Sequence, residues 1–364
     1  MRIGKLTLDG YFNYGNLLQN YALQQFLLNY ADAVDTIWHE KERYYISGSH
    51  RLTWKEMIKF VLNWNNFRDF YHKQHLGCEI ERQKKIKKWS DQHIHIRMDV
   101  TDLHDIANEY DYFVVGSDQV WNPYADLQSN FLSFAPYDKR IAYAASIASP
   151  DIPEKKVELY KHGFNGMKWI SMREQEGANT VKQFTGRDVP VVVDPTMLLT
   201  PDEWRKVSRK PDWYHGKDYI LTYFLGNRPD AAIQQIADKS GLPIVNLLDE
   251  DVYEYYVTGV DEFIWIIEHA SLIYTDSFHG TVFSILFQRP FVVCNRIDKG
   301  LFSKMTSRID TLLAYFGLEN RRGTQENNYL IENPMHISYG DTQAVFQREW
   351  NRADDYLRKA LNVE

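Results

Sequence analysis

A regular alternation of strand-like and helix-like segments is the feature that most constrains the fold of this chain. Short apolar segments such as residues 110–118 and 218–226 alternate with longer segments whose apolar positions recur at helical spacing. This alternation is typical of parallel sheets flanked by helices. Because parallel strands end at one edge of a sheet, we expect the loops after different strands to lie together and to face the ligands.

The alternation occurs in two runs, and 364 residues exceed what one hydrophobic core usually fills. The first run is predicted to contain strands at 2–8, 34–38, 110–118, 139–145 and 168–172, with a helix at 16–30. After Asp194-Pro195 the pattern restarts, with a strand at 218–226 and a helix at 230–240. We therefore expect an α/β protein with two Rossmann-like domains. The predicted ranges are 1–198, with a helical insertion at about 40–105, and 199–340, followed by a helix at 341–364 that could cross back to the first domain.

The insertion contains a basic, aromatic stretch at 51–88, with ten Lys or Arg against four Asp or Glu. One hypothesis is peripheral contact with an anionic membrane surface or a lipid-diphosphate acceptor. Its apolar contacts would be Trp54, Phe60, Trp64, Phe67 and Phe70. The alternative is a solvated helical pair whose aromatic side chains face the core.

Composition excludes several classes of protein. A formal charge of −7 and a pI near 6.0 argue against nucleic-acid binding, which requires a basic surface. Cys78 and Cys294 form no CxxC pair, and the pairs His72/His75 and His93/His95 lack a third ligand, so neither a disulfide framework nor a metal site is expected. The chain shows neither a secretory signal nor a run of about 20 apolar residues, so we expect a cytoplasmic protein.

The most specific local motif is the segment 274–281, YTDSFHGT, between an apolar strand and an apolar helix. Free N–H groups at a helix start, here near Gly280 and Thr281, suit a phosphate or carboxylate. His279 could supply a proton there, because histidine has an ordinary pKa of about 6.5. Asp276 and Ser277 are further candidates, although both residue types also cap helices.

Two arginines are candidates for holding an anion. Arg173 follows a predicted strand and precedes a predicted helix, where its guanidinium could form two bonds to a phosphate or carboxylate. The alternative is a surface pair with Glu174. Arg308 follows a polar stretch that includes Gly300 and Ser303, and it could close onto an anion.

Two corners of the first domain are candidates for binding a sugar acceptor. The first follows the first strand and would present side-chain amides to sugar hydroxyls, unless these amides only cap the helix. Its residues are Asn13, Tyr14, Gly15, Asn16 and Gln19. The second corner is Asp118, Gln119 and Trp121, where the carboxylate could accept a proton from a hydroxyl, or the segment is a plain turn. Neither corner matches GxGxxG or GxxxxGK[ST], so dinucleotide or ATP binding has no support.

Several motifs together resemble the polysaccharide pyruvyl transferase family. In chain order they are YFNYGNLLQNYALQQFL, VVGSDQVWNP, AYAASIA, SMRE, VDPTMLL, TDSFHGT and SRIDTLLAYFGLENR, within about residues 3 to 322. The resemblance implies a glycosyltransferase-B-like fold with the ligands in a cleft between the two domains. It also implies a phosphoenolpyruvate donor, bound by the second domain, and a hexose acceptor on the first, with no further cofactor.

The resemblance also assigns roles to individual residues. His279 matches the catalytic histidine of the family, and Arg173 falls where an anion-binding arginine is expected. Some relatives have a donor-binding arginine two residues before the histidine, whereas this chain has Ser277. Arg308 and the helix N–H groups are therefore the candidates for that part of the donor site.

The enol phosphate needs one proton at its methylene carbon, after which two sugar hydroxyls form a ketal. The product would enter a surface polysaccharide such as a capsule, an exopolysaccharide or a cell-wall glycan. Two alternatives stay open: a glycosyltransferase that uses a nucleotide sugar, since fold alone does not fix the reaction, and a non-catalytic sugar-binding module. No oligomeric state is predicted.

Overall fold

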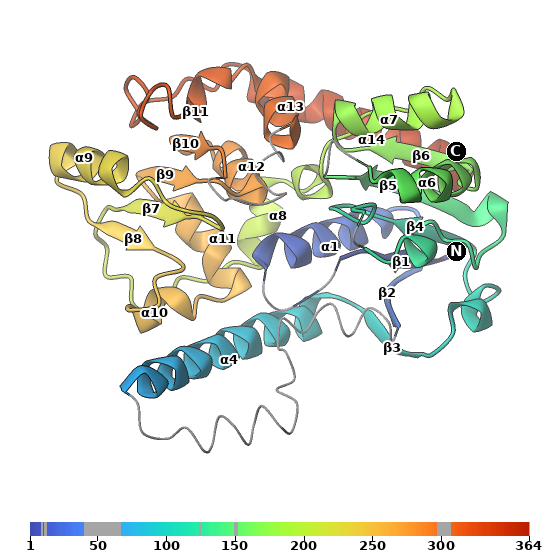
Figure 1. The fold of residues 1–364 in the computed structure, drawn as a ribbon, viewed down its shortest axis with the longest axis horizontal. Helices are drawn as coiled ribbons and strands as arrows, with labels where there is room; N and C mark the ends of the chain where they lie inside the picture. The colour runs from blue at the N-terminus through green and yellow to red at the C-terminus, as the bar shows by residue number, and fades with distance from the viewer. Residues whose placement is uncertain are drawn as a thin grey trace.

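The computed structural model describes residues 1–8, 10, 13–39, 67–123, 125–148, 152–296 and 307–363. Two sheets lie side by side, each with helices packed on it (Figure 1). The first sheet has the strand order β3-β2-β1-β4-β5-β6 and the second has β11-β10-β9-β7-β8. All the paired strands run parallel. The protein thus has two Rossmann-like α/β domains in a glycosyltransferase-B-like arrangement, as the sequence predicts.

The central strands of the first domain are mostly buried on both faces, as central parallel strands are, whereas its edge strand β3 is partly exposed. Its strands are β1 (Arg2–Leu6), β2 (Ala33–His39), β3 (Ile96–Val100), β4 (Tyr112–Val115), β5 (Arg140–Ala145) and β6 (Trp169–Met172). Its helices are α1 (Tyr14–Leu27), α4 (Phe67–His93), α5 (Leu127–Asn130), α6 (Val157–Asn165) and α7 (Gln175–Thr185). A short 3-10 helix, η4 (Pro195–Leu198), and α8 (Pro201–Lys206) lead to the second domain.

The second domain repeats this plan with shorter strands. Every residue of β7, β9 and β10 is buried. The strands are β7 (Ile220–Tyr223), β8 (Ile244–Asn246), β9 (Leu272–Thr275), β10 (Phe291–Cys294) and β11 (Arg322–Gly323). The helices are α9 (Asp230–Ser240), α10 (Tyr253–Tyr256), α11 (Val260–His269), α12 (Phe278–Leu286) and α13 (Ser307–Phe316). The chain ends with α14 (Thr342–Leu361).

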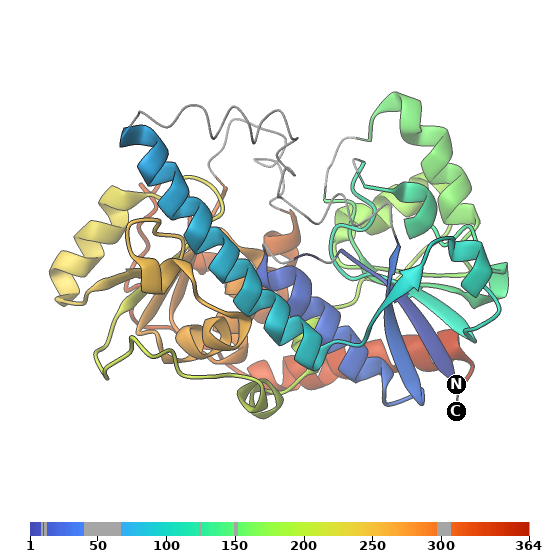
Figure 2. The same ribbon diagram turned by 90° about the horizontal axis from the view of Figure 1, so that it is seen from below.

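Helix α4 lies in the segment that the sequence suggested to be an insertion. It connects β2 to β3, which pair in parallel, so this part of the insertion is an ordinary crossover that extends the first sheet. The helix also reaches the second domain (Figure 2), where the Tyr256 hydroxyl donates a hydrogen bond to Glu79 at 2.8 Å. Residues 40–66, with Trp54, Phe60 and Trp64, lie outside the described part of the chain, as do the side chains of Phe67 and Phe70. Within the described part, no helix is long and apolar enough to cross a bilayer.

Helices α14 and α1 tie the two domains together. Helix α14 runs from the second domain along the first (Figure 2), where the Tyr356 hydroxyl donates to the carbonyl of Ala142 at 2.8 Å. From α1, Tyr14 stacks on Phe263 of α11 with ring centroids 4.5 Å apart. The Tyr14 hydroxyl also donates to the carbonyl of Thr258 at 2.8 Å. Tyr14, a candidate for acceptor binding, is therefore fully buried in the core shared by the two domains.

Candidate active site

Charged side chains from both domains meet at the domain boundary. Three come from the first domain: Asp118 beyond β4, Arg173 directly after β6, and Asp194 immediately before η4. Two come from the second: His279 in the first turn of α12 and Arg308 in the first turn of α13. Each residue is at most 8% exposed. The strands therefore gather their carboxyl-end side chains at one point, as expected for parallel sheets.

Arg173 lies at the centre of this cluster. Its Nη1 donates to Oδ2 of Asp194 at 2.7 Å, and its Nη2 donates to Oδ1 of Asp118 at 3.1 Å. Its guanidinium also lies over the Phe278 ring, 4.7 Å from the centroid. The alternative of a surface pair between Arg173 and Glu174 is wrong, because both side chains are buried and Glu174 accepts from the backbone N–H of Ile147 at 3.2 Å.

The two aspartates of the cluster are ionised at neutral pH. Burial alone would raise the pKa of Asp118, but the positive charges around it, Arg173 foremost, outweigh burial and lower it. Burial likewise opposes ionisation of Asp194, whose pKa is nevertheless held well below its usual range by His279 and Arg173. The first domain therefore supplies one cation and two anions, which leaves one negative charge in excess on this side of the site.

Arg308 is less completely paired than Arg173. Its nearest carboxylate oxygen is Oδ1 of Asp118, 3.8 Å from Nη1. Its buried Nε has no hydrogen-bond partner among the described residues. Burial, aided by the like charge of Arg173, lowers the pKa of Arg308 to about 10. A buried cation with incomplete pairing is costly, so an incoming anion would be stabilised here.

The imidazole of His279 is held between the two domains. Its Nε2 lies 3.7 Å from Oδ2 of Asp194 and has no hydrogen-bond partner in the described part of the chain. Its Nδ1 side lies against Gly15, where any side-chain Cβ would overlap the ring. Gly15 is held in turn by Asn13, whose side chain caps α1 and accepts from the Gly15 N–H at 2.9 Å. The close approach of α1 to α12 thus requires a glycine.

The residues around His279 in the motif mainly build the start of α12. Ser277 caps the helix by accepting from the Gly280 N–H at 3.2 Å, and the Thr281 hydroxyl donates to the Ser277 carbonyl at 3.0 Å. Asp276 accepts from the N–H groups of Leu225 and Gly226, both at 2.8 Å, and burial raises its pKa. The carboxylate of Asp276 thus anchors the loop after β7, and no contact joins it to Asp118 or Asp194.

The acceptor candidates in the first domain mostly bond to the protein itself. Gln19 accepts from the Ser117 N–H at 3.0 Å and donates to the Thr7 hydroxyl at 2.8 Å. The Trp121 ring has no exposed surface, and its indole N–H donates to the carbonyl of Asn130 at 3.0 Å. The expectation that Trp121 binds the acceptor therefore needs correction: this ring belongs to the core. Asn16 is buried, while Gln119 is half-buried and accepts from Asn122 at 3.4 Å.

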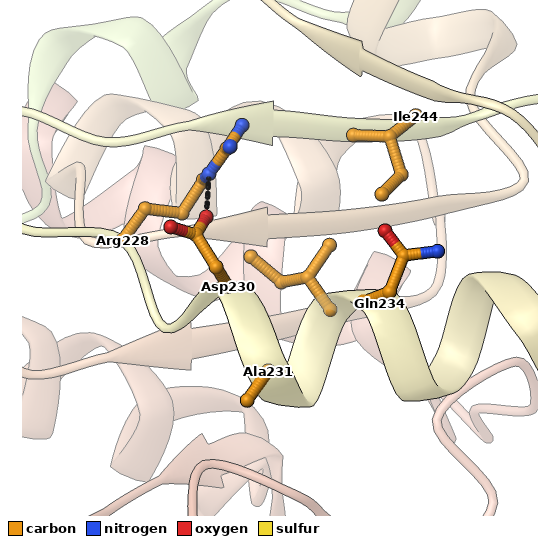
Figure 3. Close-up of a pocket in the computed structure, with 6 residues that line it drawn as sticks. Arg228, Asp230, Ala231, Gln234 and Ile244 are labelled. Atoms are coloured by element: carbon orange, nitrogen blue, oxygen red, sulfur yellow. Dashed lines mark hydrogen bonds and ion pairs between the residues drawn. The ribbon is translucent and has the colours of Figure 1, made fainter.

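A cavity of about 310 Å³ lies elsewhere in the second domain. It is lined by residues of α9 and β8 together with Arg228 (Figure 3). The Arg228 guanidinium is paired with Asp230, and none of the clustered charged residues lines the cavity. We therefore place the candidate site at the domain boundary.

The sequence did not identify Asp194 as a site residue. Its position before Pro195 suggested a turn between domains, and it does begin η4 by accepting from the Thr196 N–H at 3.0 Å. The sequence did contain one signal for Asp194. Its carboxylate follows the apolar run VVV at residues 191–193, just as Asp118 comes after an apolar strand.

The fold and the site define a two-domain α/β protein in which a histidine, two arginines and buried carboxylates meet at the domain boundary. The sequence profile described as polysaccharide pyruvyl transferase matches residues 13–298. The chain therefore belongs to the polysaccharide pyruvyl transferase family and is a transferase of polysaccharide biosynthesis.

No curated protein is recognisably similar in sequence. Among solved structures, the UDP-GlcNAc 2-epimerase of Neisseria meningitidis is 10% identical, with 99% of this chain and 100% of that chain covered and a TM-score of 0.46. A putative UDP-N-acetylglucosamine 2-epimerase from Listeria monocytogenes is also 10% identical, with 100% and 97% covered and a TM-score of 0.48. MurG of Acinetobacter baumannii is 11% identical, with 100% and 95% covered and a TM-score of 0.38.

Proposed function

We propose that this protein transfers the pyruvyl group of phosphoenolpyruvate to two hydroxyls of a hexose, forming a ketal in a surface polysaccharide. The observation that supports this most directly is His279, whose Nε2 has no hydrogen-bond partner among the described residues, in a cluster with the incompletely paired cation Arg308. An anionic substrate that must be protonated requires these two groups together. Family membership favours the same reaction.

The donor would bind through the second domain. Arg308 supplies a buried positive charge, and the first-turn N–H groups of α12 that have no partner within the helix point toward its N-terminal end. Both features favour the phosphate or carboxylate of phosphoenolpyruvate. Arg173, whose Nη atoms are already bonded to Asp194 and Asp118, would contribute mainly by holding the two carboxylates in place.

The proposed reaction balances without a cofactor. His279 protonates the methylene carbon of phosphoenolpyruvate, so the central carbon becomes an oxocarbenium-like centre that the first sugar hydroxyl attacks. The bond from this carbon to the phosphate oxygen then breaks, and the second hydroxyl adds. Overall, one hydroxyl proton ends on the new methyl group and the other on inorganic phosphate. The charge development explains the need for both an acid and fixed cations.

Asp118 is the better placed of the two carboxylates suggested as a proton acceptor. It stays ionised and belongs to the charged cluster, with Oδ1 bonded to Arg173 and facing Arg308. Asp276 is occupied by two backbone N–H groups. We therefore assign Asp118 to the acceptor hydroxyls and Asp276 to the support of the neighbouring loop.

The acceptor could be a lipid-linked sugar at the inner face of the plasma membrane, with the basic segment 51–88 contacting the bilayer. In the described part of α4, Lys84 and Lys87 are exposed, although Glu81 and Asp91 lie within 3.8 Å and 2.6 Å of them. Sedimentation with vesicles containing anionic lipid tests this contact. Binding to anionic vesicles but not to neutral vesicles would support the membrane contact, and equal binding to the two kinds of vesicle would reject it.

The reaction itself is tested by incubating the protein with phosphoenolpyruvate and candidate glycans. We expect release of phosphate and a product heavier by one pyruvic acid minus one water. Release of UDP or GDP from a nucleotide sugar, with no use of phosphoenolpyruvate, would instead identify a glycosyltransferase. Stabilisation by glycans without any turnover would identify a binding module.

A further inference from the structure

We propose that Asp194 is a positioning residue for His279: from the linker between the domains, its carboxylate orients the imidazole and stabilises its protonated form. This inference rests on the proposed function, in which His279 supplies the proton. The proton itself moves from the imidazolium to the methylene carbon of the donor. Asp194 remains a carboxylate throughout, as expected for an aspartate that supports a catalytic histidine.

The carboxylate of Asp194 is fixed on both of its oxygens. Oδ1 accepts from the N–H and the hydroxyl of Thr196, at 3.0 and 2.7 Å. Oδ2 accepts from Arg173 at 2.7 Å and from the Ser117 hydroxyl at 3.1 Å, and it faces Nε2 of His279 at 3.7 Å. Asp194 is therefore a rigid, buried anion directed at the imidazole.

Gly15 bounds the opposite side of the ring, so Asp194 and Gly15 together define one orientation for His279. The other charged groups of the cluster are one anion, Asp118, and two cations, Arg173 and Arg308, so a protonated His279 depends on the negative charge of Asp194. Asp194 has the shortest ion-pair distance to the ring, and an opposite charge at short range in a buried site favours the charged form of a histidine. The low pKa of Asp194 ensures that this negative charge is present at neutral pH.

Replacing Asp194→Asn tests the charge with little change of shape. Asparagine is also a good helix cap and can still accept from Thr196, but it loses the ion pair with Arg173, so we expect a less stable variant whose fold is checked by circular dichroism. We expect kcat for phosphate release to fall about 10- to 100-fold, because a misaligned acid costs about this much. The alkaline limb of the pH profile of kcat should move to lower pH, since the imidazolium loses its counter-charge. KM for phosphoenolpyruvate should change less than kcat.

Ser117→Ala is the matched control. It removes a hydrogen bond to the same Oδ2 atom but leaves the charge, so the alkaline limb of the pH profile should stay in place. In a His279→Gln background, Asp194→Asn should lower kcat no further, because the two residues act together. Asp194→Glu, which keeps the charge but moves it, should keep the alkaline limb while lowering kcat, and it serves as the second variant if the asparagine variant does not fold.

Two failures are distinguishable. If the wild-type protein releases no phosphate from phosphoenolpyruvate with any glycan, the proposed function fails. If the wild type is active and Asp194→Asn, folded by circular dichroism, keeps its kcat within twofold and its alkaline limb unchanged, the role of Asp194 is refuted while the function stands. An Asp194→Glu variant with wild-type kcat would also refute it.

Discussion

The two halves of the site differ in how completely their charges are paired. In the half from the first domain, Arg173 bonds to two carboxylates at 2.7 and 3.1 Å. In the half from the second domain, His279 and Arg308 approach their nearest carboxylates only to 3.7 and 3.8 Å. The first half therefore resembles a structural frame, and the second has binding capacity left for a substrate. Variants of the two halves should fail in different ways.

The largest expected effect is the loss of turnover in His279→Gln. The variant removes the proposed acid, and general acid catalysis contributes about 10²- to 10⁴-fold. Phosphate release from phosphoenolpyruvate should fall by that factor, while the melting temperature and circular dichroism stay near those of the wild type. Retention of full turnover would remove His279 from the mechanism.

Arg173→Met should act mainly on stability. It leaves Asp118 and Asp194 buried without their shared cation, and breaking a buried ion pair in this way costs about 3–5 kcal/mol. Urea unfolding measures the loss. A change below 1 kcal/mol would contradict the view of the first half as a frame.

Gly15→Ala tests the contact between the halves. Its Cβ would overlap the imidazole, so the ring must move, and a displacement of about 1 Å can cost about 100-fold in rate. Alanine has a higher helix propensity than glycine, so the substitution should not destabilise helix α1 itself. An active variant at the wild-type rate would show that the imidazole has room to shift without harm.

Arg308→Gln should weaken donor binding with little loss of stability. A hydrogen bond to a charged group contributes about 1.5–3 kcal/mol, so affinity for phosphoenolpyruvate in calorimetry should fall about 10- to 100-fold. The melting temperature should hold or rise, because an incompletely paired buried charge is removed. Unchanged affinity would assign the donor to other residues.

The smallest expected effect concerns the stability of the folded protein in acid. Asp118 and Asp194 have folded-state pKa values below those of the unfolded chain, so their contribution is complete above about pH 4 and is lost as the pH falls further. Thermal unfolding from pH 7 to pH 3 should therefore show a steeper decline for the wild type than for Asp194→Asn. Equal slopes would mean that Asp194 is not held ionised by its neighbours.

The fold was largely predictable because each element has a local sequence pattern. The helix expected at 16–30 is α1 at Tyr14–Leu27, and the strand expected at 168–172 is β6 at Trp169–Met172. Helix α4 was expected as part of a helical insertion because residues 51–88 are basic and aromatic. The structure places it between the paired strands β2 and β3, a position that composition does not indicate.

The site was predictable only in part, because its contacts join distant segments. His279, Arg173 and Asp118 come soon after strands and could be expected to meet, whereas Arg308 was suggested only by the polar stretch before it. The contact of His279 with Gly15 joins residues from different domains, and no local pattern indicates it. Trp121 shows a second limit of sequence analysis. The sequence next to a polar loop looks the same whether an aromatic side chain stacks on a sugar or, as Trp121 does, packs in the core.

The return of α14 to the first domain has a consequence for how the protein folds while the ribosome makes it. The carbonyl of Ala142 receives its hydrogen bond from Tyr356, which leaves the ribosome more than two hundred residues later. Since domains tend to fold during synthesis from the N-terminus onward, the second sheet can form before the first domain acquires its closing helix. A nascent chain arrested near residue 335 should therefore carry a first domain that is more open to proteases than the same domain in the released protein.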